Sequence, residues 1–62
     1  MDKKEELVQC IYNEDFDGAK AVAFQLIQID DDLDAVKWAL EKASDRKDTV
    51  TYKIVDKMLR YL

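Results

Sequence analysis

The chain has 62 residues, with one cysteine, one glycine, no histidine and no proline, and its net charge is −4 at pH 7. This length allows a single domain over residues 1–62, and the cysteine and histidine counts exclude an internal disulfide and the common zinc sites. A domain of this size buries only about 60% of the surface that its unfolded chain exposes, so a partner or a second copy is the remaining source of extra stability.

The spacing of apolar residues predicts four helices joined by short polar turns. The first helix is expected over about residues 3–13, with Leu7 and Ile11 on its inner face. The second is expected over about residues 16–29. Phe24 lies off the inner stripe of that second helix, which makes it a candidate for contact with a partner.

Three consecutive aspartates, Asp30 to Asp32, end the second helix and begin a third helix over about residues 33–43. The inner stripe predicted for this third helix is Leu33, Val36, Leu40 and Ala43. The predicted caps of the second and fourth helices are Asp15 or Asp17, and Asp48 or Thr49. Short connections favour antiparallel neighbours, so the predicted fold is all-α: a compact bundle of four short antiparallel helices, also describable as two tandem αα-hairpins.

The fourth helix, over residues 49–62, has more apolar sides than a helix packed on one side of a small domain. One stripe contains Val50, Ile54, Met58 and Tyr61. The other contains Val55 and Leu62, flanked by Tyr52 and Leu59. This helix is therefore expected to contact neighbours on two sides, from its own chain or from another.

These features predict a small acidic intracellular protein-binding module, such as an adaptor, an inhibitor or an accessory factor, with no catalytic activity. The predicted contact residues are Trp38, Tyr52, Val55, Leu59 and Leu62, with orientation set by Lys53, Lys57 and Arg60. Tryptophan is enriched in binding hot spots. Trp38 could equally be covered by a neighbouring helix as part of the core, and the sequence leaves both interpretations open.

A homodimer that pairs the same apolar face with itself is the first alternative. Residues 1–36 carry ten acidic and three basic residues, a net charge of −7, whereas residues 37–62 carry four acidic and seven basic residues, a net charge of +3. An acidic end and a mildly basic end are therefore expected, and two copies could attract each other head to tail.

Two alternatives involve nucleic acid. The third and fourth helices could form a helix-turn-helix, in which Lys47, Lys53, Lys57 and Arg60 would contact phosphates and Thr49, Thr51 and Tyr52 would face bases. The acidic half could instead mimic DNA. The negative net charge of the chain disfavours direct contact with nucleic acid.

The remaining motifs carry little chemistry. Asp30, Asp32, Asp34 and Glu41 have the spacing of EF-hand ligands, but Ala35 replaces the glycine of such a loop and the apolar residues keep helical register through it. A capped helix start is therefore expected, with no metal and no other cofactor. Cys10 is interpreted as a small buried hydrophobe rather than a nucleophile. Neither a signal peptide nor a membrane-spanning run is evident, so a cytoplasmic location is predicted.

Overall fold

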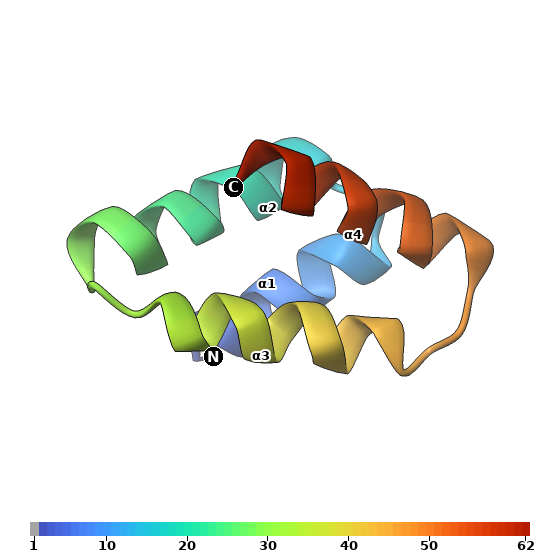
Figure 1. The fold of residues 1–62 in the computed structure, drawn as a ribbon, viewed down its shortest axis with the longest axis horizontal. Coiled ribbons are helices and arrows are strands. Elements are labelled where there is room, and N and C mark those ends of the chain that lie inside the picture. Colours follow the sequence, from blue (N-terminus) through green and yellow to red (C-terminus); the bar gives the residue numbers. More distant parts are fainter. Residues whose placement is uncertain (1) are drawn as a thin grey trace.

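The computed structural model describes residues 2–62, and over this range the chain forms four α-helices and no strand (Figure 1). The helices are α1 (Lys3–Tyr12), α2 (Phe16–Phe24), α3 (Leu33–Ser44) and α4 (Thr49–Tyr61), and α2 continues into a π-helical segment, η1 (Gln25–Ile29). These bounds confirm the all-α prediction and agree with the predicted ends to within one residue. The antiparallel order and the division into two hairpins stay predictions.

Every α-helix begins at an aspartate whose carboxylate accepts a backbone N–H from the first turn. The capping residues are Asp2, Asp15, Asp32 and Asp48, at 3.0 to 3.1 Å from the nitrogens of Lys4, Gly18, Ala35 and Val50. The sequence allowed Asp15 or Asp17 as the cap of α2 and Asp48 or Thr49 as the cap of α4. In the structure, Asp15 and Asp48 are the capping residues. Gly18 makes room for the carboxylate of Asp15, because a Cβ at this position would collide with it.

The connections turn sharply without glycine. Each contains one residue in the left-handed region, namely Glu14 (φ 60°), Asp31 (φ 51°) and Lys47 (φ 54°). In η1, the N–H of Asp30 donates to the carbonyl of Gln25 at 3.0 Å, the wider spacing of a π-helix.

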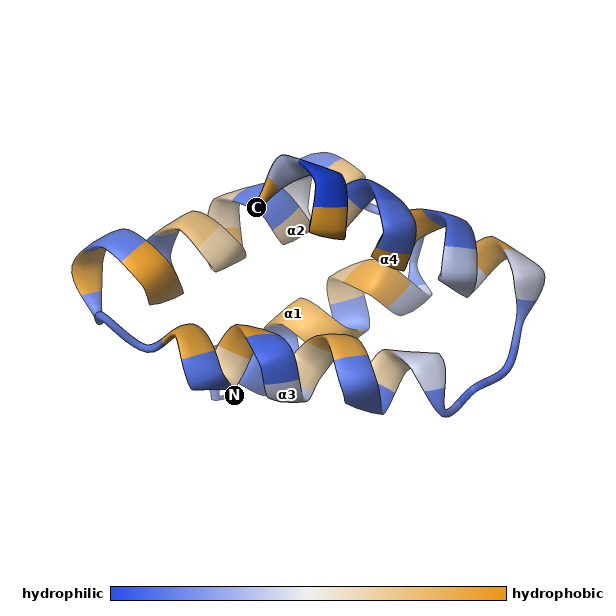
Figure 2. Ribbon diagram, viewed as in Figure 1, coloured by the Kyte–Doolittle hydropathy of each residue, from blue (hydrophilic) through white to orange (hydrophobic). Residues whose placement is uncertain are grey.

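The core is centred on α1, which packs against both α2 and α3. Leu7 and Ile11 of α1 are fully buried, as predicted. Hydrophobic positions recur along every helix on the sides that face the interior (Figure 2). Of the predicted stripe on α3, Val36, Leu40 and Ala43 are buried.

Leu33 was predicted to belong to the core, and this prediction is wrong, since its side chain is 48% exposed. The buried face of α3 includes Ala35 and Ala39 because α1 packs against that side of the helix. Leu33 therefore lies at the edge of this face, on the first residue of the helix.

The buried face of α4 also differs from the prediction, because it runs between the two predicted stripes. Its members are Thr51, Ile54, Val55 and Met58. Val50 and Tyr61, expected on the inner stripe, are 40% and 50% exposed. Thr51, which a helix-turn-helix would turn toward bases, is only 2% exposed and cannot contact them.

No helix within residues 2–62 combines the length and the hydrophobicity that crossing a bilayer requires.

Candidate protein-binding surface

The apolar residues that the core does not use lie along both flanks of α4. Tyr52 is 43% exposed, Leu59 is 59% exposed and Leu62 is 48% exposed. Val55 was expected to face outward with them, but it is only 7% exposed. Its position between Thr51 and Met58 turns it into the core, so Val55 can only form the floor of a surface site.

One flank of α4 borders a groove of about 540 Å³ against α3. Its lining residues are Lys37, Leu40, Glu41, Ser44, Asp45, Val55 and Leu59. Leu40 and Val55 are buried and form an apolar floor, whereas Leu59 stands at the wall and is exposed. Tyr52 lies on the same side of α4 as Val55 and Leu59, because residues three and seven positions apart share one helix face.

The other flank of α4 borders a smaller depression of about 340 Å³, on the side of α2 and η1. Its lining residues are Phe24, Ile27, Gln28, Tyr61 and Leu62. The predicted apolar strip is therefore divided, because Leu59 lines one depression and Leu62 lines the other.

The three predicted cations, Lys53, Lys57 and Arg60, are exposed on α4. Within the part of the chain that the structure describes, none of them forms an ion pair. The Lys57 ammonium instead lies 5.4 Å from the centre of the Phe16 ring on α2. Lys57 therefore lies on the α2 side of α4, and Lys53 and Arg60, four and three positions away, share its helix face.

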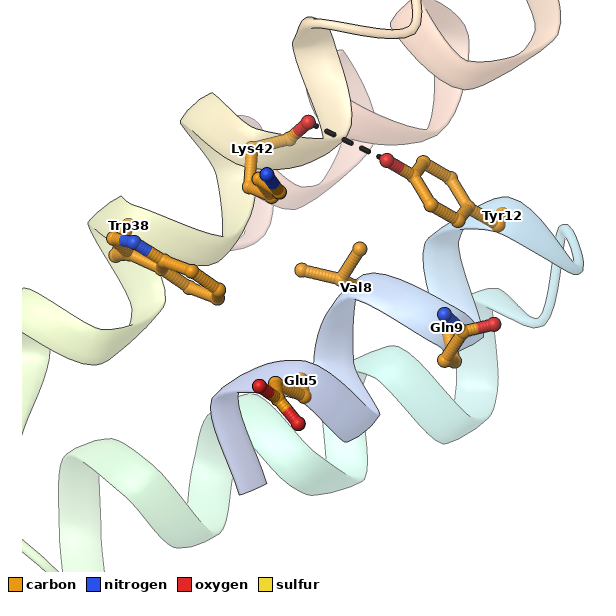
Figure 3. A pocket seen from close by; sticks show the side chains of 6 residues that line it. All are labelled: Glu5, Val8, Gln9, Tyr12, Trp38 and Lys42. Atoms are coloured by element: carbon orange, nitrogen blue, oxygen red, sulfur yellow. Dashed lines mark hydrogen bonds between the residues drawn. The ribbon is translucent and has the colours of Figure 1, made fainter. Parts of the chain in front are cut away.

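Trp38 lies on a neighbouring flank of α3, beside the groove at Leu59 and not within it. It is 38% exposed and borders a depression of about 380 Å³ between α1 and α3 (Figure 3). The ammonium of Lys4 lies 4.8 Å from the centre of its ring, a cation–π contact. Tyr12 closes the far end of this depression by donating its hydroxyl proton to the carbonyl of Lys42 at 3.4 Å.

Trp38 and the α4 strip therefore do not form one continuous surface. Glu41 and Asp45 border the groove at Leu59 and also a second depression beside Trp38, of about 320 Å³, which they line together with Trp38 and Lys42. Two exposed carboxylates thus separate the two apolar regions on α3.

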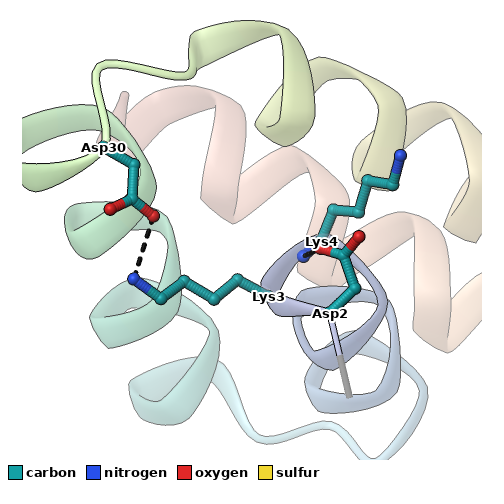
Figure 4. Close-up of polar contacts among 4 residues, drawn as sticks. All are labelled: Asp2, Lys3, Lys4 and Asp30. Atoms are coloured by element: carbon teal, nitrogen blue, oxygen red, sulfur yellow. Dashed lines mark hydrogen bonds and ion pairs between the residues drawn. The ribbon is translucent and has the colours of Figure 1, made fainter.

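Two of the aspartates with EF-hand spacing, Asp30 and Asp32, make contacts within the fold. Asp32 caps α3, which is helical from Leu33 through Glu41, where a calcium loop would have to be. Asp30 accepts a hydrogen bond from the ammonium of Lys3 at 2.9 Å (Figure 4). Within residues 2–62 no group of three or more potential ligands is placed to hold a metal ion.

Cys10 is half-buried on α1 and packs against the core. Burial raises the pKa of its thiol, and the negative charges of Asp15 and Glu6 raise this pKa further. A raised pKa keeps the thiol protonated, which lowers its reactivity because the thiolate is the nucleophile.

Sequence reasoning missed the depression at the end of α4 and the burial of Thr51. The signal for the depression was the position of Phe24 off the inner stripe of its helix, next to a π-helical segment that shifts the residues after it. Thr51 gave no signal, because threonine is common on exposed faces.

No protein-family model matches the chain, and no match was found among curated proteins or solved structures.

Proposed function

We propose that the chain is a small protein-binding module whose main contact site is the groove between α3 and α4, and that it performs no catalytic step. The observation that carries the proposal is the contrast within this groove. Leu59 is 59% exposed at the wall, while Leu40 and Val55 are buried at the floor. Such a groove offers a partner both an apolar floor and an apolar anchor.

The fitting occupant is an amphipathic helix of a larger protein. In the proposed antiparallel bundle, α4 lies between α2 on one flank and α3 on the other. The groove is lined by α3 from Lys37 to Asp45 and by α4 at Val55 and Leu59, so it fits a short helix. The rim carries Lys37 together with Glu41 and Asp45, which favours a partner segment with charges of both signs. Trp38 is proposed as a separate contact beyond these carboxylates, and the cytoplasm as the location.

Photo-crosslinking tests this proposal. Leu59 is replaced by a benzophenone amino acid, and Ala21, which is exposed on α2 and lines neither depression beside α4, carries the same probe as the control. In extract of the cells that produce the protein, the probe at position 59 should give an adduct of one defined mass that the probe at position 21 does not give.

Competition makes the result specific to the groove. An excess of the unlabelled protein should suppress the adduct, whereas an excess of the Leu59→Ser variant should not. Equal products from both probe positions, or equal suppression by both competitors, would overturn the proposal.

A further inference from the structure

A row of alternating aromatic and basic side chains runs between α2 and α4, on the flank of α4 that faces away from the groove at Leu59. We name it the basic seam and define it by Phe16, Lys20, Lys57 and Tyr61. The Lys20 ammonium lies 5.0 Å from the centre of the Phe16 ring and 5.6 Å from that of Tyr61. The Lys57 ammonium lies 5.4 Å from the Phe16 ring, so the seam joins the two helices.

The protein itself leaves the charge of this seam almost unneutralised. Lys57 and its neighbours Lys53 and Arg60 form no ion pair within residues 2–62. Lys20 pairs with Asp17 at 3.6 Å, but the Asp17 side chain is 93% exposed, and such a pair contributes little in water. A positive, partly apolar surface therefore stands on a chain whose net charge is −4.

A segment of the opposite character ends η1. Asp30, Asp31 and Asp32, which we name the acidic tip, are all exposed, and the preceding Ile29 is 70% exposed. Only Asp30 has a basic partner within the described residues, the ammonium of Lys3 at 2.9 Å. The acidic tip thus combines three exposed negative charges, of which Asp30 pairs with Lys3 and Asp32 caps α3, with an exposed apolar side chain.

The acidic tip and the basic seam follow one another along the molecule. The tip lies at the end where η1 turns into α3, and the C-terminal end of α4 lies between this turn and the rest of the seam (Figure 1). Phe24, Ile27 and Leu62 line the depression between them. The order along this side is therefore acidic, apolar and basic.

We propose that the occupant of this side is a second copy of the chain, related by a two-fold axis through the apolar middle. A two-fold axis inverts the order, so the acidic tip of each copy meets Lys20 and Lys57 of the other. The apolar middles then cover each other. A surface with this order is self-complementary, as an isologous dimer interface must be.

The available surface is sufficient for this contact. A stable interface buries about 800 Å² on each partner. The accessible surface of the chain is 4141 Å², so the interface would use about a fifth of it. The side involved extends along the longest dimension of the molecule, which is 30 Å.

The dimer uses the flank of α4 that does not border the proposed partner groove, so it stands independently of that proposal.

The occupant's chemistry follows from the seam, which needs carboxylates next to an apolar side chain. Nucleic acid supplies phosphates, but the exposed aspartates at the tip would repel them. An acidic segment of another protein has the same chemistry as the tip, and the test below separates it from a second copy.

Sedimentation equilibrium of charge-reversed variants tests the dimer. The seam variant combines Lys20→Glu with Lys57→Glu, and the tip variant combines Asp30→Lys with Asp31→Lys. Each variant alone should raise the dissociation constant of the dimer about tenfold or more, because like charges then face each other. An equimolar mixture of the two variants should restore association as a mixed dimer.

Single charge reversals elsewhere on the surface separate this effect from a change in folding and from a reversed charge as such. Glu14→Lys places a lysine at an exposed turn residue with φ 60°, like Asp31 with φ 51°. Lys47→Glu reverses an exposed lysine that lies outside the seam and lines neither depression beside α4. Both controls should leave the dissociation constant of the dimer unchanged, and circular dichroism should show every variant folded.

Salt gives a second readout on the unmodified protein. Raising ionic strength from about 20 mM to about 500 mM shortens the screening length from roughly 20 Å to about 4 Å, so the dimer should weaken. A chain that stays monomeric at every concentration overturns the proposal. So does a monomer that uses the seam to bind an acidic protein or nucleic acid. A dimer that the reversals and salt leave unchanged, and that Leu59→Ser disrupts, also overturns it while leaving the groove in use.

Discussion

The helices α1 and α4 use their apolar residues in different ways. In α1 the large aliphatic residues Leu7, Val8 and Ile11 are all buried, and the helix contacts both α2 and α3. In α4 the buried face takes Ile54, Val55 and Met58, yet Tyr52, Leu59, Tyr61 and Leu62 remain exposed. The hydrophobicity of α1 is thus accounted for by the fold, whereas that of α4 exceeds what the fold uses.

Truncation at the centre of α1 should have the largest effect. Ile11→Ala is expected to lower the free energy of unfolding by about 2–5 kcal/mol, because it removes a fully buried side chain and leaves a cavity. That loss is comparable to the whole stability of a chain of this length. Urea unfolding followed by circular dichroism measures it, with the exposed neighbour Gln9→Ala as the control.

Two adjacent residues of α4 allow buried and exposed side chains to be compared within one helix. Met58 is fully buried and Leu59 is 59% exposed. Met58→Ala should cost about 2–5 kcal/mol of unfolding free energy, and Leu59→Ala should change it by no more than about 0.5 kcal/mol. Urea unfolding of both variants at the same low concentration provides the comparison. Similar losses for the two would show that α4 is buried on all sides.

The cap of α3 should have an intermediate effect. Asp32→Ala removes the carboxylate that accepts the N–H of Ala35 at 3.1 Å, and should cost about 1 kcal/mol of unfolding free energy. The control is Asp56→Ala, an exposed residue in the middle of α4 with no capping role. The melting temperatures of the two variants should differ by several degrees in thermal unfolding. Equal melting temperatures would show that this cap does not stabilise the fold.

The smallest expected effect concerns the thiol on α1. Because burial and the charges of Asp15 and Glu6 raise the pKa of Cys10, less thiolate is present near pH 8 in the folded chain than in the unfolded one. Alkylation by iodoacetamide should therefore be several-fold slower in buffer than in urea. The rate in buffer should rise as pH increases through the raised pKa. An equal rate in buffer and urea would contradict this picture.

Local signals were enough to predict where the helices begin and end. Aspartates at the starts and the apolar spacing around Leu7 and Ile11 depend on residues close in sequence. The rotation of α4 was not predictable in this way. With apolar residues on two sides, the pattern allowed either stripe to face inward, and the contacts with α2 and α3 placed the buried face between them.

The candidate site was predictable only in part for the same reason. Leu59 and Leu62 are exposed as expected, but Val55 faces the core and Trp38 borders a different depression, between α1 and α3. Helical spacing shows which residues share a face, and non-local packing decides which faces are covered. The depression between η1 and the end of α4 depends on a π-helical segment, and no sequence rule applied to the chain predicts one.

The central claim is that the outer flanks of α4 serve binding and not folding. The most direct test is urea unfolding, in dilute solution, of a variant that combines Tyr52→Ser, Leu59→Ser and Leu62→Ser. We expect the free energy of unfolding to fall by about 1 kcal/mol or less relative to the unmodified chain, because all three side chains are exposed. A loss of several kcal/mol, as expected for Ile11→Ala, would mean that these residues belong to the core and would contradict the account.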